Sequence, residues 1–191
     1  MGQRTADSDK ARDAPRGWTY NPSSWRQRLP IVGLGVVGMG IAFYLASYQL
    51  GLVDEVWDPL FGGGTERVLE SGVAQLFPVP DALLGSIGYA LDWIFGLIGG
   101  TDRYRSKPWA VVIFGIGIVP FGGVSIALGL AMPAIVGNGC LLCIVSTVIS
   151  IVMIPPSWDE IWASIEAMRR MMRRGASLRD AFLGRAAPAA T

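Results

Sequence analysis

Long uncharged apolar runs constrain the fold of this chain more than any other feature. Three runs, Leu29 to Val53, Pro108 to Val136 and Gly137 to Pro156, contain no charged residue. A further run, Ala82 to Ile98, is interrupted only by Asp92. A helix needs roughly 20 apolar residues to cross the hydrocarbon core of a bilayer, so the three uncharged runs qualify and the interrupted one is marginal. The sequence therefore predicts an integral membrane protein.

The number of spans follows from the places where the apolar runs break. The last two uncharged runs adjoin, and Pro133, Gly137 and Gly139 at their junction favour a turn. Only 16% of the residues are charged, against about a quarter in an average soluble domain, which agrees with a membrane protein. We expect an all-α fold, a four-transmembrane-helix bundle with an outer loop at 51–80.

The distribution of basic residues predicts the orientation of the spans. Lys and Arg gather in 1–28, in 99–108 and after Ile154, and these three segments fall on one side of a four-span bundle. Loop 51–80 contains a single basic residue, Arg67. Its acidic residues are Asp54, Glu55, Asp58, Glu66 and Glu70. Since basic loops stay in the cytoplasm, both termini are expected there, with loop 51–80 and the turn 137–140 outside.

Two polar segments flank the predicted membrane domain, 29–155. Residues 1–28 are expected to form a disordered cytoplasmic tail, and no cleavage site follows them. Residues 156–191 are expected to form a cytoplasmic tail with a basic amphipathic helix at 157–175, lying against anionic lipid headgroups. A partner-binding role for that helix is the alternative. Its apolar residues at helical spacing are Ile161, Trp162, Ile165, Met168 and Met172.

Several functions are disfavoured by motifs that lack their context. The segment GLGVVG (33–38) matches a dinucleotide-binding pattern, but no strand precedes it, so its glycines suit helix packing in lipid instead. The net charge of +1 makes no case for nucleic acid, and the absence of His removes most zinc and haem sites, so no metal is expected. A transporter is weakly supported, because Asp92 is the one charged residue within the spans. Asp92 is either a functional intramembrane acid or a group that reaches cytoplasmic water.

Both cysteines of the chain, Cys140 and Cys143, form a C-x-x-C pair at the predicted start of the fourth span. A structural zinc site needs four ligands, and a c-type haem needs His where Ile144 stands. Two such thiols can form and exchange a disulfide, and the helix dipole favours the thiolate of the first. The sequence places Cys140 at the wet boundary and Cys143 one turn deeper, where a lipid-soluble quinone is accessible. The alternative is that both are small packing residues.

Three segments together carry a family resemblance: GNGCLLCIVSTVIS (137–150), ERV-x-x-S (66–71) and FPVPDALLGSIGYAL (77–91). In this order the sequence resembles the vitamin K epoxide reductase family of four-helix membrane thiol oxidoreductases, over about residues 25–155. The resemblance implies electron flow from protein dithiols, or from a thioredoxin-fold partner on the outer face, to a membrane quinone. It implies that Cys140 exchanges disulfides and that Cys143 attacks the quinone. The expected location is a bacterial plasma (inner) membrane.

Two departures from the family pattern qualify this expectation. Members usually carry a second cysteine pair in the outer loop, at positions that correspond to about Trp57 and Thr65 here. The expected quinone contacts are Asp81, where the family usually has Asn, and Thr147, where some members have Tyr; Asp81 would have to be protonated to donate a hydrogen bond. The predicted function is a membrane thiol:quinone oxidoreductase that supports disulfide bond formation. The alternative is a non-catalytic membrane subunit or assembly factor derived from this fold.

Overall fold

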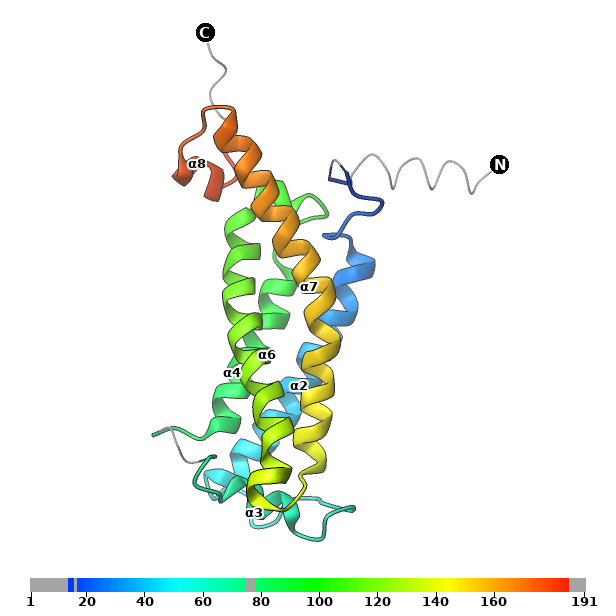
Figure 1. Cartoon of the computed structure of the whole chain (residues 1–191), viewed down its shortest axis with the longest axis vertical. Coiled ribbons are helices and arrows are strands. Elements are labelled where there is room, and N and C mark those ends of the chain that lie inside the picture. The colour runs from blue at the N-terminus through cyan, green and yellow to red at the C-terminus, as the bar shows by residue number, and fades with distance from the viewer. Residues whose placement is uncertain (1–13, 16, 75–77, 186–191) are drawn as a thin grey trace, which may run out of the picture.

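The computed structural model describes residues 14–15, 17–74 and 78–185, and the described part of the chain is helical, without strands. Four long helices lie side by side in a bundle (Figure 1). Short helices α3 (Gly64–Leu69), α5 (Arg103–Ser106) and α8 (Leu178–Phe182) lie at its ends. The long helices are α2 (Trp25–Gln49), α4 (Asp81–Leu97), α6 (Pro108–Val136) and α7 (Leu141–Arg173).

Three helices, α2, α6 and α7, are long and apolar enough to cross a membrane by length and composition. This confirms the predicted all-helical membrane protein. Helix α4 has 17 residues, which span ~25 Å at 1.5 Å per residue, slightly less than the ~30 Å hydrocarbon core. Its membrane crossing, and with it the four-span count, therefore stays a prediction.

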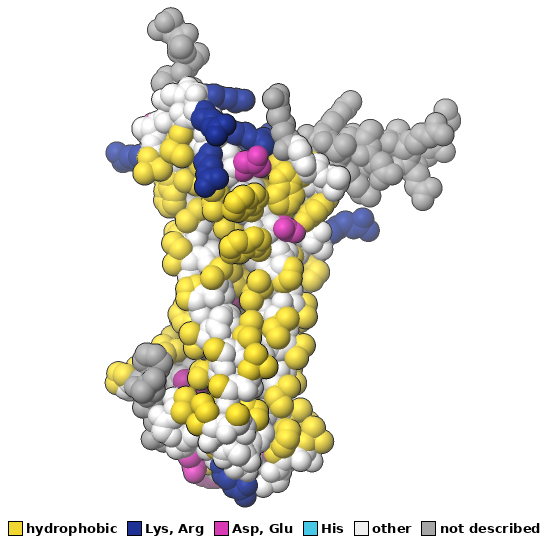
Figure 2. Space-filling view, in the orientation of Figure 1, with side chains coloured by type: hydrophobic (Ala, Val, Ile, Leu, Met, Phe, Trp, Pro, Cys, Tyr) yellow, Lys and Arg dark blue, Asp and Glu magenta, His cyan; other side chains and the backbone are white. Residues whose placement is uncertain are grey.

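The outer surface of the bundle is apolar along its middle (Figure 2). Exposed side chains there include Val36, Ile116 and Val148, one from each of the long apolar helices. Most of the visible Lys and Arg side chains lie at the end of the bundle where α7 finishes (Figure 2). An apolar belt bounded by charged ends is the surface that a bilayer requires.

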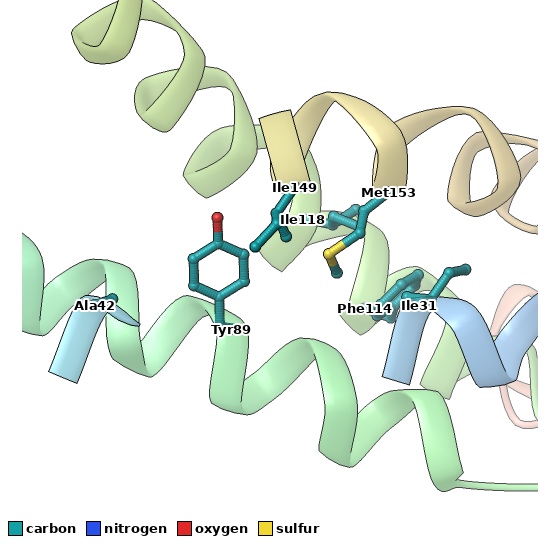
Figure 3. Packing of buried hydrophobic residues seen from close by; sticks show 7 residues of the cluster. All are labelled: Ile31, Ala42, Tyr89, Phe114, Ile118, Ile149 and Met153. Atoms are coloured by element: carbon teal, nitrogen blue, oxygen red, sulfur yellow. The ribbon is translucent and has the colours of Figure 1, made fainter. Parts of the chain in front are cut away.

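Small residues let the helices approach closely, as the sequence predicts. The GLGVVG segment lies inside α2, so it is not the strand-to-helix turn that a dinucleotide would need. A Cβ added at Gly38 would lie 2.7 Å from the Tyr89 ring of α4, and one added at Gly129 of α6 would overlap Thr147 of α7. Buried side chains from all four long helices complete the contact (Figure 3): Ile31, Ala42, Tyr89, Phe114, Ile118, Ile149 and Met153.

The C-terminal amphipathic helix is not a separate element, which corrects the expectation for 157–175. Helix α7 continues without a break through Pro155 and Pro156. Its 33 residues span ~50 Å, well beyond the thickness of a hydrocarbon core. The residues after the prolines are held in the bundle because Ser157, Glu160 and Ser164 are fully buried there. A position in the lipid headgroups for the end of α7 stays a prediction.

The segment 1–28, expected to be a disordered tail, lies partly outside the described residues (1–13 and 16). The rest differs from the expectation, since α2 already begins at Trp25 and the preceding residues pack against the bundle. Asn21 Nδ2 donates to the Thr101 carbonyl at 2.8 Å, and Ser23 Oγ donates to Glu160 Oε1 at 2.5 Å. Composition indicated a polar tail, but these buried partners order its last turn.

A buried ionic cluster closes this end of the bundle. Arg103 forms an ion pair with Glu160, and both side chains are at most 1% exposed. Arg28, equally buried, donates to the carbonyls of Gly96 at 2.9 Å and Gly99 at 3.0 Å. Gly96 lies in the last turn of α4, whose carbonyls lack intrahelical partners, and Gly99 lies just after the helix end, so the guanidinium group supplies hydrogen bonds that this end of the helix lacks.

Truncation of Glu160 tests this cluster. Glu160→Ala leaves Arg103 buried without its counter-ion, and we expect a loss of about 3–5 kcal/mol in the free energy of unfolding. The matched control is Glu166→Ala on the same helix, which removes a half-exposed pair with Arg170 and should cost less than about 0.5 kcal/mol. Thermal unfolding in detergent micelles measures both. Equal midpoints for the two variants would contradict a stabilising role for the buried pair.

Candidate thiol and quinone site

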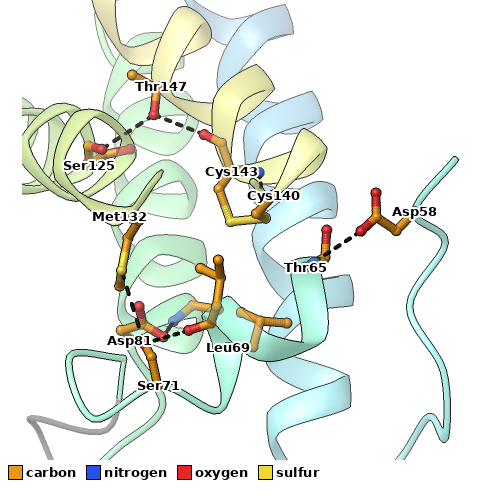
Figure 4. The surroundings of a disulfide bond; sticks show 12 residues. Asp58, Thr65, Leu69, Ser71, Asp81, Ser125, Met132, Cys140, Cys143 and Thr147 are labelled. Carbon is orange, nitrogen blue, oxygen red and sulfur yellow. Dashed lines mark hydrogen bonds between the residues drawn. A yellow bond between two sulfur atoms is a disulfide. The ribbon is translucent and has the colours of Figure 1, made fainter. Parts of the chain in front are cut away.

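The two cysteines are joined as a disulfide at the start of α7, with their Cα atoms 5.2 Å apart (Figure 4). Gly137, at a φ of 71°, ends α6 in the left-handed conformation, and the chain then turns into the next helix. Cys140 is the N-cap of α7, and its Sγ accepts a hydrogen bond from the Cys143 amide at 3.1 Å. The predicted turn and the predicted placement of the pair at a helix start are both found.

The Cys140 side chain is only 3% exposed, which differs from the expected wet position at the membrane boundary. It packs with Val68 of α3, with Ala74 and with Met132. The outer loop also covers the preceding residue, because a Cβ added at Gly139 would lie 2.6 Å from Cδ1 of Phe61. The outer loop and the end of α6 therefore cover Cys140.

Asp58 organises the part of the outer loop that covers the pair. Its carboxylate accepts hydrogen bonds from the amides of Phe61 at 3.0 Å and Thr65 at 2.9 Å. Desolvation opposes ionisation, but the backbone donors outweigh it and hold the pKa of Asp58 below its usual value. A carboxylate with a depressed pKa contributes its full stabilisation above its unfolded-state pKa, and the contribution is lost as the pH falls from there through the lower pKa of the folded loop.

The two loop positions that correspond to the family's second cysteine pair lie in different environments. Thr65 is fully buried at the first turn of α3, whereas Trp57 is 63% exposed. Neither position supplies a thiol. Cys140 and Cys143 are therefore the only thiols of the chain.

A cavity of about 260 Å³ lies beside Cys143, between α2, α4, α6 and α7. Most of its wall is aliphatic or aromatic, with Leu45 and Phe121 as examples. A mostly apolar cavity with a few polar groups is typical of small-molecule sites. The residues with polar side chains in its wall, besides Cys143, are Asp81, Tyr89, Ser125 and Ser146.

The structure brings three of the four predicted site residues to this cavity or its rim. Cys143 and Asp81 line it, and Cys140 is bonded to Cys143. The Asp81 carboxylate accepts a hydrogen bond from Gln49 at 2.7 Å. Thr147 lies outside the wall, where its Oγ1 donates to the Cys143 carbonyl at 2.8 Å (Figure 4).

The sequence analysis did not assign Tyr89 to the site, although the chain carries a signal for it. Asp81, Gly85 and Tyr89 are spaced four residues apart, so a helix places them on one face. The tyrosine hydroxyl donates to the Ser146 carbonyl at 2.8 Å and lies 2.8 Å from Ser150 Oγ. Within the described residues, no three His, Cys, Asp or Glu side chains gather in a way that would hold a metal ion.

A helical membrane bundle with a disulfide beside an apolar cavity defines a membrane thiol–disulfide protein. The sequence model of the Vitamin K epoxide reductase family matches residues 29–158, and the chain belongs to this family. Members of the family are in general oxidoreductases that use quinones. No match was found among curated proteins or among solved structures.

Removal of the Phe61 ring should uncover the cysteine pair. After reduction by a dithiol, we expect Phe61→Ala to raise the alkylation rate of Cys140 about tenfold, because the loop no longer packs on Gly139. Mass spectrometry of alkylated protein gives the rate at each cysteine. The matched control is Leu60→Ala, which truncates a neighbouring side chain that is 68% exposed and should leave the rate unchanged. Equal rates in both variants would show that Phe61 does not cover the pair.

Proposed function

We propose that this protein is a membrane thiol:quinone oxidoreductase that supports disulfide bond formation. The observation that carries the proposal is the position of Cys143, which is bonded to Cys140 and lines an apolar cavity between the membrane helices. A disulfide in contact with a cavity of this kind can pass electrons to an acceptor that dissolves in lipid. The family match supports the same reaction class.

The reaction separates into two exchanges at the pair. A dithiol on the outer side reduces the disulfide and becomes a disulfide itself, so the two electrons and two protons now reside on Cys140 and Cys143. The reduced pair then returns to the disulfide as a quinone takes up two electrons and two protons and leaves as the quinol. Cys140, next to the outer loop, is the residue proposed to exchange with the dithiol, and Cys143 is the one proposed to reduce the quinone.

Asp81 and Thr147 have different proposed roles. Asp81 lines the cavity and is proposed to bind a quinone oxygen, for which its carboxyl group must be protonated. Thr147 bonds to the Cys143 carbonyl and is proposed to act on the quinone through that residue.

The partner and the orientation belong to the same proposal. We propose a thioredoxin-fold thiol protein on the outer face of a bacterial plasma membrane, with both termini of the chain in the cytoplasm. The support is the charge distribution: Arg103, Arg105 and Lys107 lie in or next to α5. Arg103 pairs with Glu160, far along α7 from the cysteine pair, and cytoplasmic loops of membrane proteins carry such basic residues.

Quinone reduction by the purified protein tests the proposal. In lipid nanodiscs with a reduced thioredoxin-like protein and ubiquinone or menaquinone, the wild-type chain should reduce quinone, followed by its absorbance. Cys143→Ala should fall to the uncatalysed rate because no thiol then faces the cavity. Ile144→Ala, a substitution at the next residue on the exposed side of α7, is the matched control and should stay active. Background rates for the wild type with either quinone would contradict the oxidoreductase and favour the non-catalytic subunit.

The role of Asp81 predicts a separable effect. Asp81→Ala should raise the KM for quinone about tenfold, or roughly 1.4 kcal/mol, because one polar contact to the quinone oxygen is lost. The rate of disulfide exchange with the dithiol partner should not change. Steady-state kinetics with each substrate varied in turn measure both values. A changed KM for the dithiol with an unchanged KM for quinone would assign Asp81 to the dithiol exchange and contradict its role in quinone binding.

A further inference from the structure

Asp92 is a buried carboxylic acid that the mechanism above does not use. It lies on α4 and is 5% exposed, and it makes no hydrogen bond or ion pair with the residues that the structure describes. The other fully buried acid, Glu160, differs because Arg103 and Ser23 both bind it. Burial of an acid without a partner is costly, and in membrane helices such residues usually serve a function.

A second, smaller cavity of about 30 Å³ adjoins Asp92, between α4, α6 and α7. Its wall includes four polar side chains, those of Tyr89, Asp92, Ser125 and Ser150. A buried water needs a cavity of at least about 10–15 Å³ and two to four polar partners, and this cavity meets both conditions. The cavity therefore suits one water molecule bound between Asp92 and the hydroxyl groups.

Tyr89 lies between this small cavity and the cavity beside Cys143. Both cavities have Gly85, Tyr89, Phe121 and Ser125 in their walls. The tyrosine ring extends from α4 toward α7 (Figure 3), where its hydroxyl lies 2.8 Å from Ser150 Oγ. Ser150 lines the small cavity, so the pair of hydroxyl groups connects the water position to the wall of the larger cavity.

We propose that Asp92 supplies a proton to a quinone bound beside Cys143, through a water molecule and the hydroxyl groups of Ser150 and Tyr89. This inference rests on the proposed function. Asp92 is a positioning residue in this scheme because, of the three side chains on the path, only Tyr89 lines the cavity in which the quinone would bind. The assignment explains why an acid stands at a position where an apolar side chain would pack at lower cost.

The step balances in electrons and protons. The reduced Cys140–Cys143 pair loses two electrons and two protons as its disulfide forms, and the quinone takes up two electrons and two protons. Tyr89 gives one proton to the quinone and regains one from Ser150. Ser150 in turn regains a proton from the water molecule, and the water regains one from the Asp92 carboxyl group. The resulting Asp92 carboxylate recovers a proton from bulk water before the next turnover. This uptake balances the thiol proton that is released to bulk water instead of to the quinone.

Few other groups can titrate near Asp92. Tyr89 is the other titratable side chain in the wall of the small cavity. Helix α2 packs on α4 through Gly35 and Gly38, which carry no side chain. The remaining wall residues from α6 and α7 are uncharged: Ile118, Phe121, Gly122, Ser125, Ser150 and Met153.

A pH profile of single-turnover quinone reduction tests the proton path. The full chain in nanodiscs is reduced with dithiothreitol, freed of it and mixed with quinone at a series of pH values. For the wild type, we expect the rate to rise with thiol ionisation and then to fall at high pH as Asp92 loses its proton. Asp92→Asn, which keeps the shape but cannot donate that proton, should react about tenfold more slowly and lack the high-pH limb. Asp92→Glu should restore it.

Two further variants test the proton path independently of the Asp92 variants. Tyr89→Phe breaks the path but keeps the ring, so it should lose the same limb even if the Asp92 variants fold poorly. Asp54→Asn, an exposed acid of the outer loop, is the control and should match the wild type. A wild-type profile in Asp92→Asn would overturn the proton path while leaving the oxidoreductase intact. A wild-type chain that reduces no quinone would instead refute the proposed function, and this inference with it.

Discussion

Satisfaction of backbone carbonyls and buried charges at the end of α4 is the constraint on which the rest of the structure depends. Lipid offers no hydrogen bonds, so a helix that ends within the bundle must find donors in the protein. Arg28 and Arg103 supply them, and Glu160 neutralises one of the two guanidinium groups. Because these residues come from α2, α5 and α7, one cluster ties α2 and α7 to the end of α4.

The register of α7 connects that cluster to the redox site at the opposite end. The same helix begins at the cysteine pair and carries Glu160 almost six turns later, so a rigid rod places both. Pro155 and Pro156 do not separate the two parts, since the buried face after them is held by Arg103 and Ser23. One continuous helix therefore joins the cavity beside Cys143 to the ionic cluster at the far end.

Burial also changes how the redox site must work. The sequence suggested an outer cysteine open to water, but Val68 packs on Cys140 and Phe61 lies over the preceding Gly139. Asp58 and its amide donors give that loop a defined shape. A disulfide covered in this way is shielded from bulk solvent on the side of the loop.

The sequence by itself determined the membrane character, the helical class and the cysteine pair at a helix start, because long apolar runs and a C-x-x-C spacing are local features. It also indicated Asp81 through a local motif. Only the tertiary structure decided that Cys140 is covered, that Thr147 faces α6 instead of the cavity, and that Tyr89 separates two cavities. It alone ordered residues 20–28 and joined 157–173 to the last long helix. These outcomes depend on contacts between residues far apart in the chain, and helical periodicity does not specify which helix a given face meets.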